Sequence, residues 1–474
     1  MTKSTWGPTY EEMLHPETVG PEIRERIRMA GTLDPVKLFD ITWKGKNTGE
    51  SGQTGSGPSP EPFYIVIPRE ITGVEANVVV LYGRDFPTGS HKVGAAYSVT
   101  MEAQLAGETR RENILVFPST GNYGIGGAWV GPRMGYDTLV ILPELMSRER
   151  FELIEEYGAR YVRTPGGESS VREIYQKCWE LKKDPKVRVL NQFETMGNYR
   201  FHYYVTGNTV VELMGLLKSR DIGNGRCSAF VSAVGSAGTI SAGDRLKQVF
   251  PETRVVGLEP IQCPTLYCNG YGDHDIQGIG DKHVTWIHNV RNMDLLMCVD
   301  DTECKLILQV LSDPAGQEYL AGAGLDEATV QELSTMFGIS GVCNLIGAIK
   351  TAKYYRLGPD ETVVTVLTDG IDRYYSVMDR LTERFGRLTG AEAKERHRSV
   401  LLGAKFDYIQ EGTVLNRDRW FNLKYYTWVE QQGKRVEELN AQRSRSWWKD
   451  QQDMVGEIDR KLKAVRGQGG GLGS

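Results

Sequence analysis

The sequence predicts an α/β fold with mostly parallel sheets flanked by helices. Runs rich in valine, isoleucine and leucine alternate with helix-length segments between residues 63 and 260. The expected strands are 78–82, 114–117, 138–142, 160–163, 229–234, 254–259 and, later in the chain, 362–367. The expected helices are 94–106, 124–134, 147–157, 170–182, 204–218 and 341–355. Apolar strands separated by helices indicate βαβ units whose sheet is covered on both faces.

Composition excludes several classes of function. The chain has 474 residues, 40% of them hydrophobic, and a net charge of −5 from 56 basic and 61 acidic residues. The basic residues are scattered, which argues against a nucleic-acid partner. No apolar run approaches the roughly 20 residues of a membrane span, so no membrane partner is expected.

The seven cysteines include no CxxC pair. They are therefore expected to be reduced thiols, without a disulfide framework or a metal site. The N-terminus lacks the apolar core of a secretion signal, and a cytoplasmic location is expected.

The chain divides into three parts. Residues 1–60 form an N-terminal extension that ends in a Gly/Ser/Thr/Pro-rich flexible loop at 45–60. Residues 61–385 form the core, and 386–474 form a C-terminal helical extension that ends in a flexible tail at 467–474. The extension is expected to pack on the core or on a second subunit.

A lysine stands at the junction between the first expected strand of the core and the following helix. The segment Asp85-Phe86-Pro87-Thr88-Gly89-Ser90-His91-Lys92 precedes a helix that is expected to begin near Val93. On local sequence, Lys92 could be a surface charge, a phosphate contact or an amine that forms a Schiff base with a carbonyl cofactor.

Three turns at strand ends carry glycine, hydroxyl and amide side chains: 118–127, 235–243 and 367–370. Helix N-termini at such turns offer free N–H groups to anions. The second turn suits a phosphate, yet no GxxxxGK[ST] or GxGxxG nucleotide motif is present. A phosphate site without a nucleotide motif, together with a lysine at another strand end, indicates pyridoxal 5'-phosphate.

Six ordered motifs resemble the fold-type II pyridoxal-phosphate enzymes, closest to the cysteine synthase and cystathionine β-synthase group. The resemblance runs from about Tyr82 to Tyr374. The motifs are Ser119-Thr120-Gly121-Asn122 with Gly124-Ile125-Gly126; Leu142 to Arg150 with Tyr157-Gly158-Ala159; Asn191-Gln192-Phe193 with Thr206-Gly207; Gly235 to Thr239; Ile276-Gln277-Gly278-Ile279-Gly280; and Gly338-Ile339-Ser340-Gly341.

Two positions depart from the cysteine synthase pattern. The segment Pro87 to Lys92 is similar to the lysine motif of the tryptophan synthase β-subunit, although that enzyme's loop with a catalytic glutamate is absent. Tyr123 stands where cysteine synthases usually carry a small threonine. The resemblance implies a two-domain fold of the tryptophan synthase β type, in which a smaller mobile domain at about 95–205 closes over the ligand.

The resemblance also implies residue roles. Lys92 would be catalytic, binding the cofactor and moving the α-proton of the substrate. The other cofactor-binding residues would be Asn122 at the ring oxygen, Thr368 at the pyridine nitrogen, with Asp369 as the alternative there, His91 near the phosphate, and Gly235, Ser236, Ala237, Gly238 and Thr239 around the phosphate. Substrate-binding residues would be Ser119, Thr120, Gly121, Tyr123 and Gln192.

The implied activity is β-replacement on a β-substituted L-amino acid of the serine or cysteine type, through an aminoacrylate, with a thiol or sulfide co-substrate. The alternative is a β-eliminating lyase, a desulfhydrase or dehydratase, which gives a keto acid and ammonia. A third hypothesis is a non-catalytic scaffold that keeps the cofactor fold. The resemblance further implies a homodimer.

Overall fold

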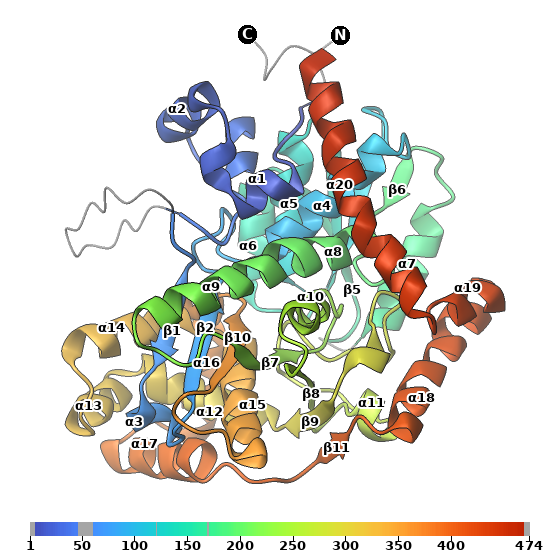
Figure 1. Ribbon diagram of the computed structural model, residues 1–474. Helices are drawn as coiled ribbons and strands as arrows, with labels where there is room; N and C mark the ends of the chain where they lie inside the picture. The colour runs from blue at the N-terminus through green and yellow to red at the C-terminus, as the bar shows by residue number, and fades with distance from the viewer. Residues whose placement is uncertain (1–4, 46–59, 120, 168–169, 469–474) are drawn as a thin grey trace.

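The fold contains two sheets, and its class is the predicted one (Figure 1). The computed structural model describes residues 5–45, 60–119, 121–167 and 170–468. The larger sheet is made, in chain order, of β1 (Tyr64–Ile67), β2 (Asn77–Tyr82), β7 (Cys227–Ala233), β8 (Arg254–Pro260), β9 (Leu295–Val299), β10 (Thr362–Leu367) and β11 (Ile409–Glu411). The spatial order is β1-β2-β10-β7-β8-β9-β11, parallel except for the two edge strands.

The smaller sheet is entirely parallel and lies within residues 114–189. Its strands are β3 (Ile114–Pro118), β4 (Asp137–Pro143), β5 (Arg160–Thr164) and β6 (Val187–Val189), in the order β5-β4-β3-β6. All the strands expected from sequence form, and β1, β6, β9 and β11 add to them.

Helices surround both sheets, as the βαβ pattern predicts. Those of the first half are α1 (Tyr10–Leu14), α2 (Pro21–Met29), α3 (Arg69–Thr72), α4 (Lys92–Leu105), α5 (Asn122–Arg133), α6 (Arg148–Glu156), α7 (Val171–Leu181), α8 (Met196–Arg200), α9 (Gly207–Ser219) and α10 (Ala242–Val249). The rest are α11 (Thr265–Cys268), α12 (Asp301–Ser312), α13 (Pro314–Gly322), α14 (Glu327–Met336), α15 (Ile339–Tyr355), α16 (Tyr375–Phe385), α17 (Gly390–Arg396), α18 (Val414–Asn422), α19 (Val436–Ala441) and α20 (Arg445–Gln468).

The larger sheet is buried on both faces. In β2, Val78 and Val80 join one hydrophobic cluster, whereas Val79 and Leu81 join another on the opposite face. Because side chains alternate along a strand, a continuous valine run can serve two cores at once. The sheet therefore holds the loops at its strand ends on a rigid base.

The two extensions pack against each other on the core. A capping box between Thr9 and Glu12 starts α1, and the backbone N–H of Tyr10 donates to Asp459 Oδ1 of α20 at 2.8 Å. Arg466 of α20 forms an ion pair with Glu12 at 2.6 Å. Figure 1 shows the red α20 running across the molecule to the blue N-terminal helices.

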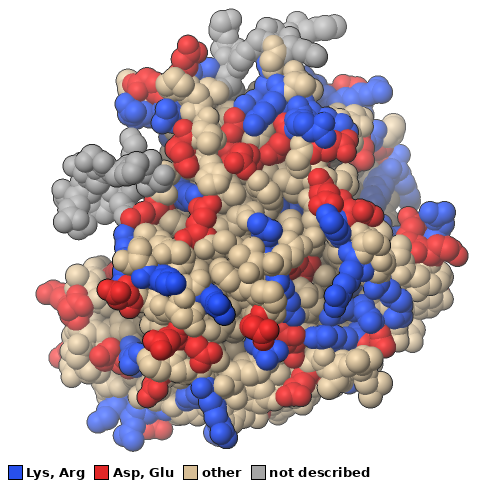
Figure 2. Space-filling model, viewed as in Figure 1, with Lys and Arg blue, Asp and Glu red and all other residues tan. Residues whose placement is uncertain are grey.

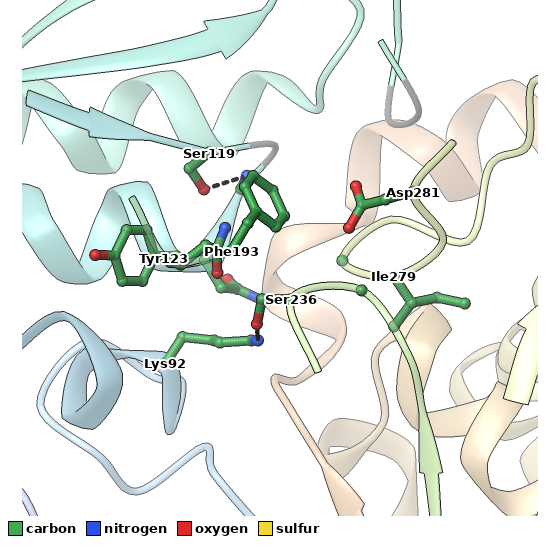
Figure 3. A pocket seen from close by; sticks show the side chains of 12 residues that line it. Lys92, Ser119, Tyr123, Phe193, Ser236, Ile279 and Asp281 are labelled. Carbon is green, nitrogen blue, oxygen red and sulfur yellow. Dashed lines mark hydrogen bonds between the residues drawn. The ribbon is translucent and has the colours of Figure 1, made fainter. Parts of the chain in front are cut away.

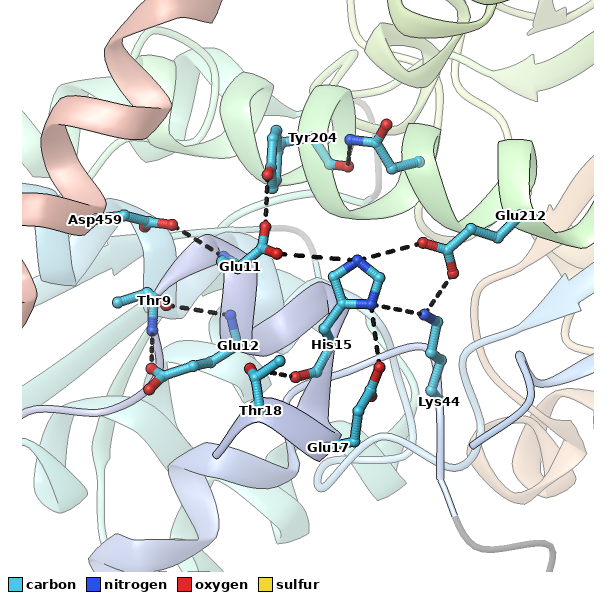
Figure 4. A network of polar contacts seen from close by, with 11 residues as sticks. Thr9, Glu11, Glu12, His15, Glu17, Thr18, Lys44, Tyr204, Glu212 and Asp459 are labelled. Carbon is cyan, nitrogen blue, oxygen red and sulfur yellow. Dashed lines mark hydrogen bonds and ion pairs between the residues drawn. The ribbon is translucent and has the colours of Figure 1, made fainter. Parts of the chain in front are cut away.

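A polar network anchors the N-terminal extension to α9. Figure 4 shows His15 between Glu17, at 3.2 Å, and Glu212 of α9, at 3.5 Å. Lys44 pairs with the same Glu212 at 2.5 Å. These contacts fix the segment that carries the neighbouring residue Trp43.

The C-terminal extension is mostly helical, as expected, but it also supplies the edge strand β11, which pairs antiparallel with β9. This strand was not expected in a segment predicted as a helical extension. The predicted tail begins too early as well, because α20 includes Gly467. The rest of that tail, 469–474, and residues 46–59 of the predicted flexible loop lie outside the described residues.

Within the described ranges, no single helix is long and apolar enough to cross a membrane. The pair α14 and α15 passes that test only together and is bent by 116°. On the face shown in Figure 2, basic and acidic side chains are interspersed.

Candidate active site

Lys92 is the first residue of α4, at the junction where the sequence places it. Gly89 has φ +67°, a left-handed conformation that glycine adopts without strain and that allows the tight turn before the helix. The Lys92 ammonium nitrogen donates to Ser236 Oγ at 3.1 Å. Only 9% of Lys92 is exposed, so the surface-charge interpretation is excluded.

The turn after β7 is a cradle of small residues, Gly235 to Thr239. A Cβ on Gly238 would lie 2.1 Å from Asn198 Oδ1, and one on Gly235 would lie 3.1 Å from Ile279 Cα. Neighbouring atoms thus leave no room for a side chain at Gly238 and little room at Gly235. Ala237 has φ +61°, a conformation that is rare for a residue with a side chain. The cradle keeps its backbone accessible, which suits a phosphate.

His91 lies beside this cradle as a neutral imidazole. Burial, and secondarily the charge of Lys92, hold the pKa of His91 well below its usual value. His91 Nε2 lies 3.2 Å from Thr239 Oγ1. His91 therefore contacts the cradle by a hydrogen bond between neutral groups.

The loop after β3 carries the predicted substrate-binding residues. The N–H of Gly121 donates to Ser119 Oγ at 2.9 Å, and the hydroxyl of Tyr123 donates to the carbonyl of Leu190 at 3.0 Å. Tyr123 therefore offers the cavity its ring and not its hydroxyl. Thr120 lies outside the described residues.

Asn122 takes part in a buried network that sequence reasoning did not foresee. Its Nδ2 donates to Asp369 Oδ2 at 2.6 Å, and the Tyr374 hydroxyl donates to the same oxygen at 2.8 Å. Arg150 Nη2 lies 4.0 Å from this carboxylate. Burial raises the pKa of Asp369, against the nearby charges of Arg150 and Arg373.

Two adjoining cavities bring these residues together. One, of about 350 Å³, is lined by Lys92, Ser119, Gly121, Asn122, Tyr123, Gln192, Phe193, Gly235, Ser236, Gly278, Ile279 and Asp281 (Figure 3). The other, of about 330 Å³, is lined by Lys92, Ser232, Ala233, Gly235, Ala237, Gly238, Thr239, Gly278, Ile279, Asn344 and Thr368. Lys92, Gly235, Gly278 and Ile279 border both. Phe193 and Asp281 were not predicted as site residues, although Phe193 belongs to a named motif and Asp281 directly follows another.

The cavity fits pyridoxal phosphate. The cradle that side chains would fill suits its phosphate, and the Lys92 amine suits its aldehyde. Asn122 Oδ1 is buried without a hydrogen-bond partner in the described part of the chain, so it remains available to a bound group. Thr368 borders the cavity with Lys92, whereas Asp369 is turned toward Asn122 and Tyr374.

Known proteins resemble the chain in sequence. The model of the pyridoxal-phosphate dependent enzyme family matches residues 81–369. A cysteine synthase of Staphylococcus aureus is 32% identical over 302 residues, which cover 64% of this chain and 88% of that protein. A probable cysteine synthase of Bacillus subtilis is 30% identical over 292 residues, covering 61% and 85%.

Solved structures share the fold. A hydrogen sulfide-producing enzyme from Fusobacterium nucleatum superposes with a TM-score of 0.55 at 25% identity, covering 71% of this chain and 91% of that one. O-acetylserine sulfhydrylase isoform 3 from Entamoeba histolytica gives a TM-score of 0.58 at 24% identity, covering 72% and 93%. The family match extends over more than half of the chain and includes both Lys92 and the glycine cradle. The chain therefore belongs to the family of pyridoxal-phosphate-dependent enzymes.

Proposed function

We propose that this protein catalyses β-replacement on a β-substituted L-amino acid of the serine or cysteine type, with a thiol or sulfide as the second substrate. One observation carries the proposal. Lys92 donates a hydrogen bond to Ser236, and both residues line the same cavity as Ser119 and Gln192. The similarity to two curated cysteine synthases supports a sulfur nucleophile.

Each group in the cavity has a role in this reaction. Bound pyridoxal phosphate would withdraw electrons from the Cα of the substrate. Lys92 holds the cofactor and then moves the proton at Cα, and its 3.1 Å contact with Ser236 sets the position of its amine. The cofactor phosphate is bound by the Gly235–Thr239 cradle, with His91 beside it.

The remaining contacts orient the substrate and the cofactor ring. Ser119, Thr120, Gly121 and Gln192 bind the substrate carboxylate, and the N-terminus of α5 favours this negative charge. Tyr123 forms part of the cavity wall and limits the space for the substrate side chain. Asn122 contacts the ring oxygen, and Thr368 faces the pyridine nitrogen, because Thr368 lines the cavity whereas the Asp369 carboxylate is bonded elsewhere.

β-Elimination is the second candidate. It is favoured by the 25% identical hydrogen sulfide-producing enzyme of Fusobacterium nucleatum, whose structure matches over 71% of this chain. Both reactions begin with loss of the α-proton and of the β-substituent, and they differ in whether a nucleophile or water completes the turnover.

Assembly and location belong to the same proposal. We expect a homodimer in the cytoplasm, with the C-terminal extension as additional contact surface. The smaller domain, at about 95–205, would move over the substrate, since it carries the Ser119–Tyr123 loop on one side of the cavity.

The test is a substrate screen with the purified protein. β-Substituted L-amino acids are supplied with and without sulfide, and keto acid, ammonia and new thiol-containing amino acid are quantified. Product that requires the nucleophile supports β-replacement, and keto acid without it supports elimination. The variant Lys92→Ala should lose cofactor attachment and all turnover. Full turnover by this variant would contradict the proposal.

A further inference from the structure

A carboxylate that the roles above leave unused lines the substrate cavity. Asp281 borders the same cavity as Lys92, Ser119 and Gln192. In Figure 3, Asp281 lies at the right and Tyr123 at the left, with Phe193 and Ser236 between them. Asp281 therefore belongs to the wall of the cavity that also contains Lys92.

The backbone around Asp281 is fixed by contacts on both sides. The N–H of Gly280 donates to the carbonyl of Val234 at 2.8 Å, next to the phosphate cradle. The Thr265 hydroxyl donates to the carbonyl of Asp281 itself at 2.8 Å. Gly278 and Gly280 have φ +107° and +78°, conformations that favour glycine and turn the chain back to the cavity wall. The position of the Asp281 backbone is thus set by its own loop and by Thr265 and Val234.

The side chain of Asp281 has no structural partner to explain its burial. Only 8% of the residue is exposed, and no hydrogen bond or ion pair from the described residues reaches its carboxylate oxygens. Buried carboxylates are usually paired, so an unused one facing a cavity calls for a function. The titratable groups that face it are Lys92 of α4, Tyr175 of α7 and Cys263 after β8.

Burial raises the pKa of Asp281 to about 7, although the charge of Lys92 lowers it. At neutral pH both protonation states are therefore populated. A group that has to give and take a proton in one cycle is most effective under this condition.

We propose that Asp281 is the catalytic acid–base group at Cβ. In the first half of the reaction, the Cβ–X bond breaks, its electron pair leaves with X, and the proton of Asp281 passes to X to give H–X. The electron pair left at Cα by proton removal forms the Cα=Cβ bond. In the second half, the carboxylate takes the proton of the incoming nucleophile, whose electron pair forms the new bond to Cβ.

This inference rests on the proposed function, and it assigns a different proton transfer to each of two residues. Lys92 moves the proton at Cα, and Asp281 moves the proton at the group bound to Cβ. The two roles can be separated by substrates. β-Chloro-L-alanine loses chloride, which needs no proton, whereas a thiolate or hydroxide leaving group does. L-Alanine has no leaving group and reports only the exchange of its α-hydrogen.

The experiment compares wild-type holoenzyme, Asp281→Asn and the matched control Asp273→Asn, an exposed aspartate of the same loop that pairs with Lys282 at 2.9 Å. Each protein is assayed with two substrates. One is β-chloro-L-alanine, and the other is the substrate with the most basic leaving group among those that the wild type converts. Exchange of the α-hydrogen of L-alanine is followed by NMR in D₂O. The absorbance of the bound cofactor is titrated with pH as a readout that needs no turnover.

For Asp281→Asn we expect about a 100-fold loss of turnover on the basic leaving group, in the range of general acid–base contributions. Keto acid formation from β-chloro-L-alanine without added nucleophile, and exchange of L-alanine, should stay within about threefold, since neither needs a proton to be moved at Cβ. The pH dependence of the cofactor absorbance should differ between the wild type and Asp281→Asn, because only the wild type has a titratable carboxyl at this place in the cavity. Asp273→Asn should behave as the wild type in every assay.

An equal loss on both substrates, no loss on either, or an identical pH dependence of the cofactor absorbance in the wild type and Asp281→Asn would overturn the assignment. If the wild type leaves every β-substituted amino acid intact, the proposed function fails and the role of Asp281 with it. If the wild type converts them and Asp281→Asn does so equally well, the Asp281 assignment alone fails.

Discussion

The indole of Trp43 stacks on the imidazole of His91, with ring centroids 5.3 Å apart and planes 27° from parallel. Trp43 belongs to the N-terminal extension, whereas His91 precedes Lys92 and contacts Thr239 of the phosphate cradle. Trp43 Nε1 also donates to Thr206 Oγ1 at 2.8 Å. The extension thus reaches the cofactor site through a fully buried side chain.

Replacing Trp43 by phenylalanine should weaken both stability and cofactor retention. The change removes the donor to Thr206 and part of a buried ring, which costs about 1–3 kcal/mol of unfolding free energy. The smaller ring gives less stacking area on His91, which should loosen His91 against the cradle and make cofactor dissociation faster. Urea unfolding and dialysis of the cofactor measure the two effects. Trp179→Phe, at a 43% exposed tryptophan, is the control. Unchanged retention in Trp43→Phe would show that the extension does not act on the cradle.

Asp369→Asn should destabilise the protein through its buried charges. The substitution removes the carboxylate that balances Arg150, and breaking a buried ion pair from one side costs about 3–5 kcal/mol. The nearby Asp372→Asn alters an exposed carboxylate of the same segment and should change little. Urea unfolding of both variants gives the comparison. Equal stability of the two would mean that the Asp369 network contributes nothing to the fold.

Tyr123→Thr, which restores the small residue that cysteine synthases usually carry, should widen the cavity. Tyr123 is 1% exposed, and its ring fills space beside Ser119 and Gln192. Bulky thiols should gain over sulfide by roughly tenfold in relative kcat/KM, at the cost of about 3 kcal/mol of stability. Tyr123→Phe keeps the ring and should retain the original preference. If the ratio of kcat/KM for bulky thiols to that for sulfide stays unchanged in Tyr123→Thr, Tyr123 does not determine which nucleophile is preferred.

The stability of the protein should depend on Asp281 in a defined pH window. Because burial raises the pKa of this carboxyl from 3.8 to about 7, the protonated form is favoured in the folded state. Its contribution is therefore fully present below about pH 4 and is lost as the pH rises through about 7. At about 1.4 kcal/mol per pKa unit, the loss above that pH is at most about 4 kcal/mol.

Asp281→Asn lacks this titration. Its melting temperature should equal that of the wild type near pH 4 and exceed it near pH 8, as measured by differential scanning fluorimetry across the range. A melting difference that is the same at both ends would mean that Asp281 titrates normally in the folded protein.

The sequence predicts the fold where strands are long and apolar. The run at 78–82 forms β2 within one residue, because valine repeats that serve two buried faces have no other stable arrangement. Sequence could not predict β6, whose Val-Arg-Val is only three residues long, or β11, which is a strand only because the edge of β9 is available to it. Such strands depend on tertiary context and not on local pattern.

The residues of the candidate site also divide into those that sequence motifs predict and those that depend on tertiary contacts. Lys92 and the glycine cradle were predicted from six ordered motifs that resemble one enzyme family, and the structure brings both to one cavity. Asp281 could not, since its access to the cavity depends on a turn whose backbone is held by Val234 and Thr265 from other segments. The hydrogen bond between Asn122 and Asp369 joins residues 247 positions apart, and no sequence pattern in either segment predicts it.

The contact between Tyr10 and Asp459 has a consequence for how the chain acquires its structure during synthesis. These residues are 449 positions apart, so α1 lacks this partner until the ribosome has synthesised the chain as far as α20. Until then the apolar side chains of Met13 and Leu14, fully or almost fully buried in the finished protein, lack the surface that α20 provides. The apolar side chains of α1 therefore stay exposed until α20 has been synthesised and can pack against them.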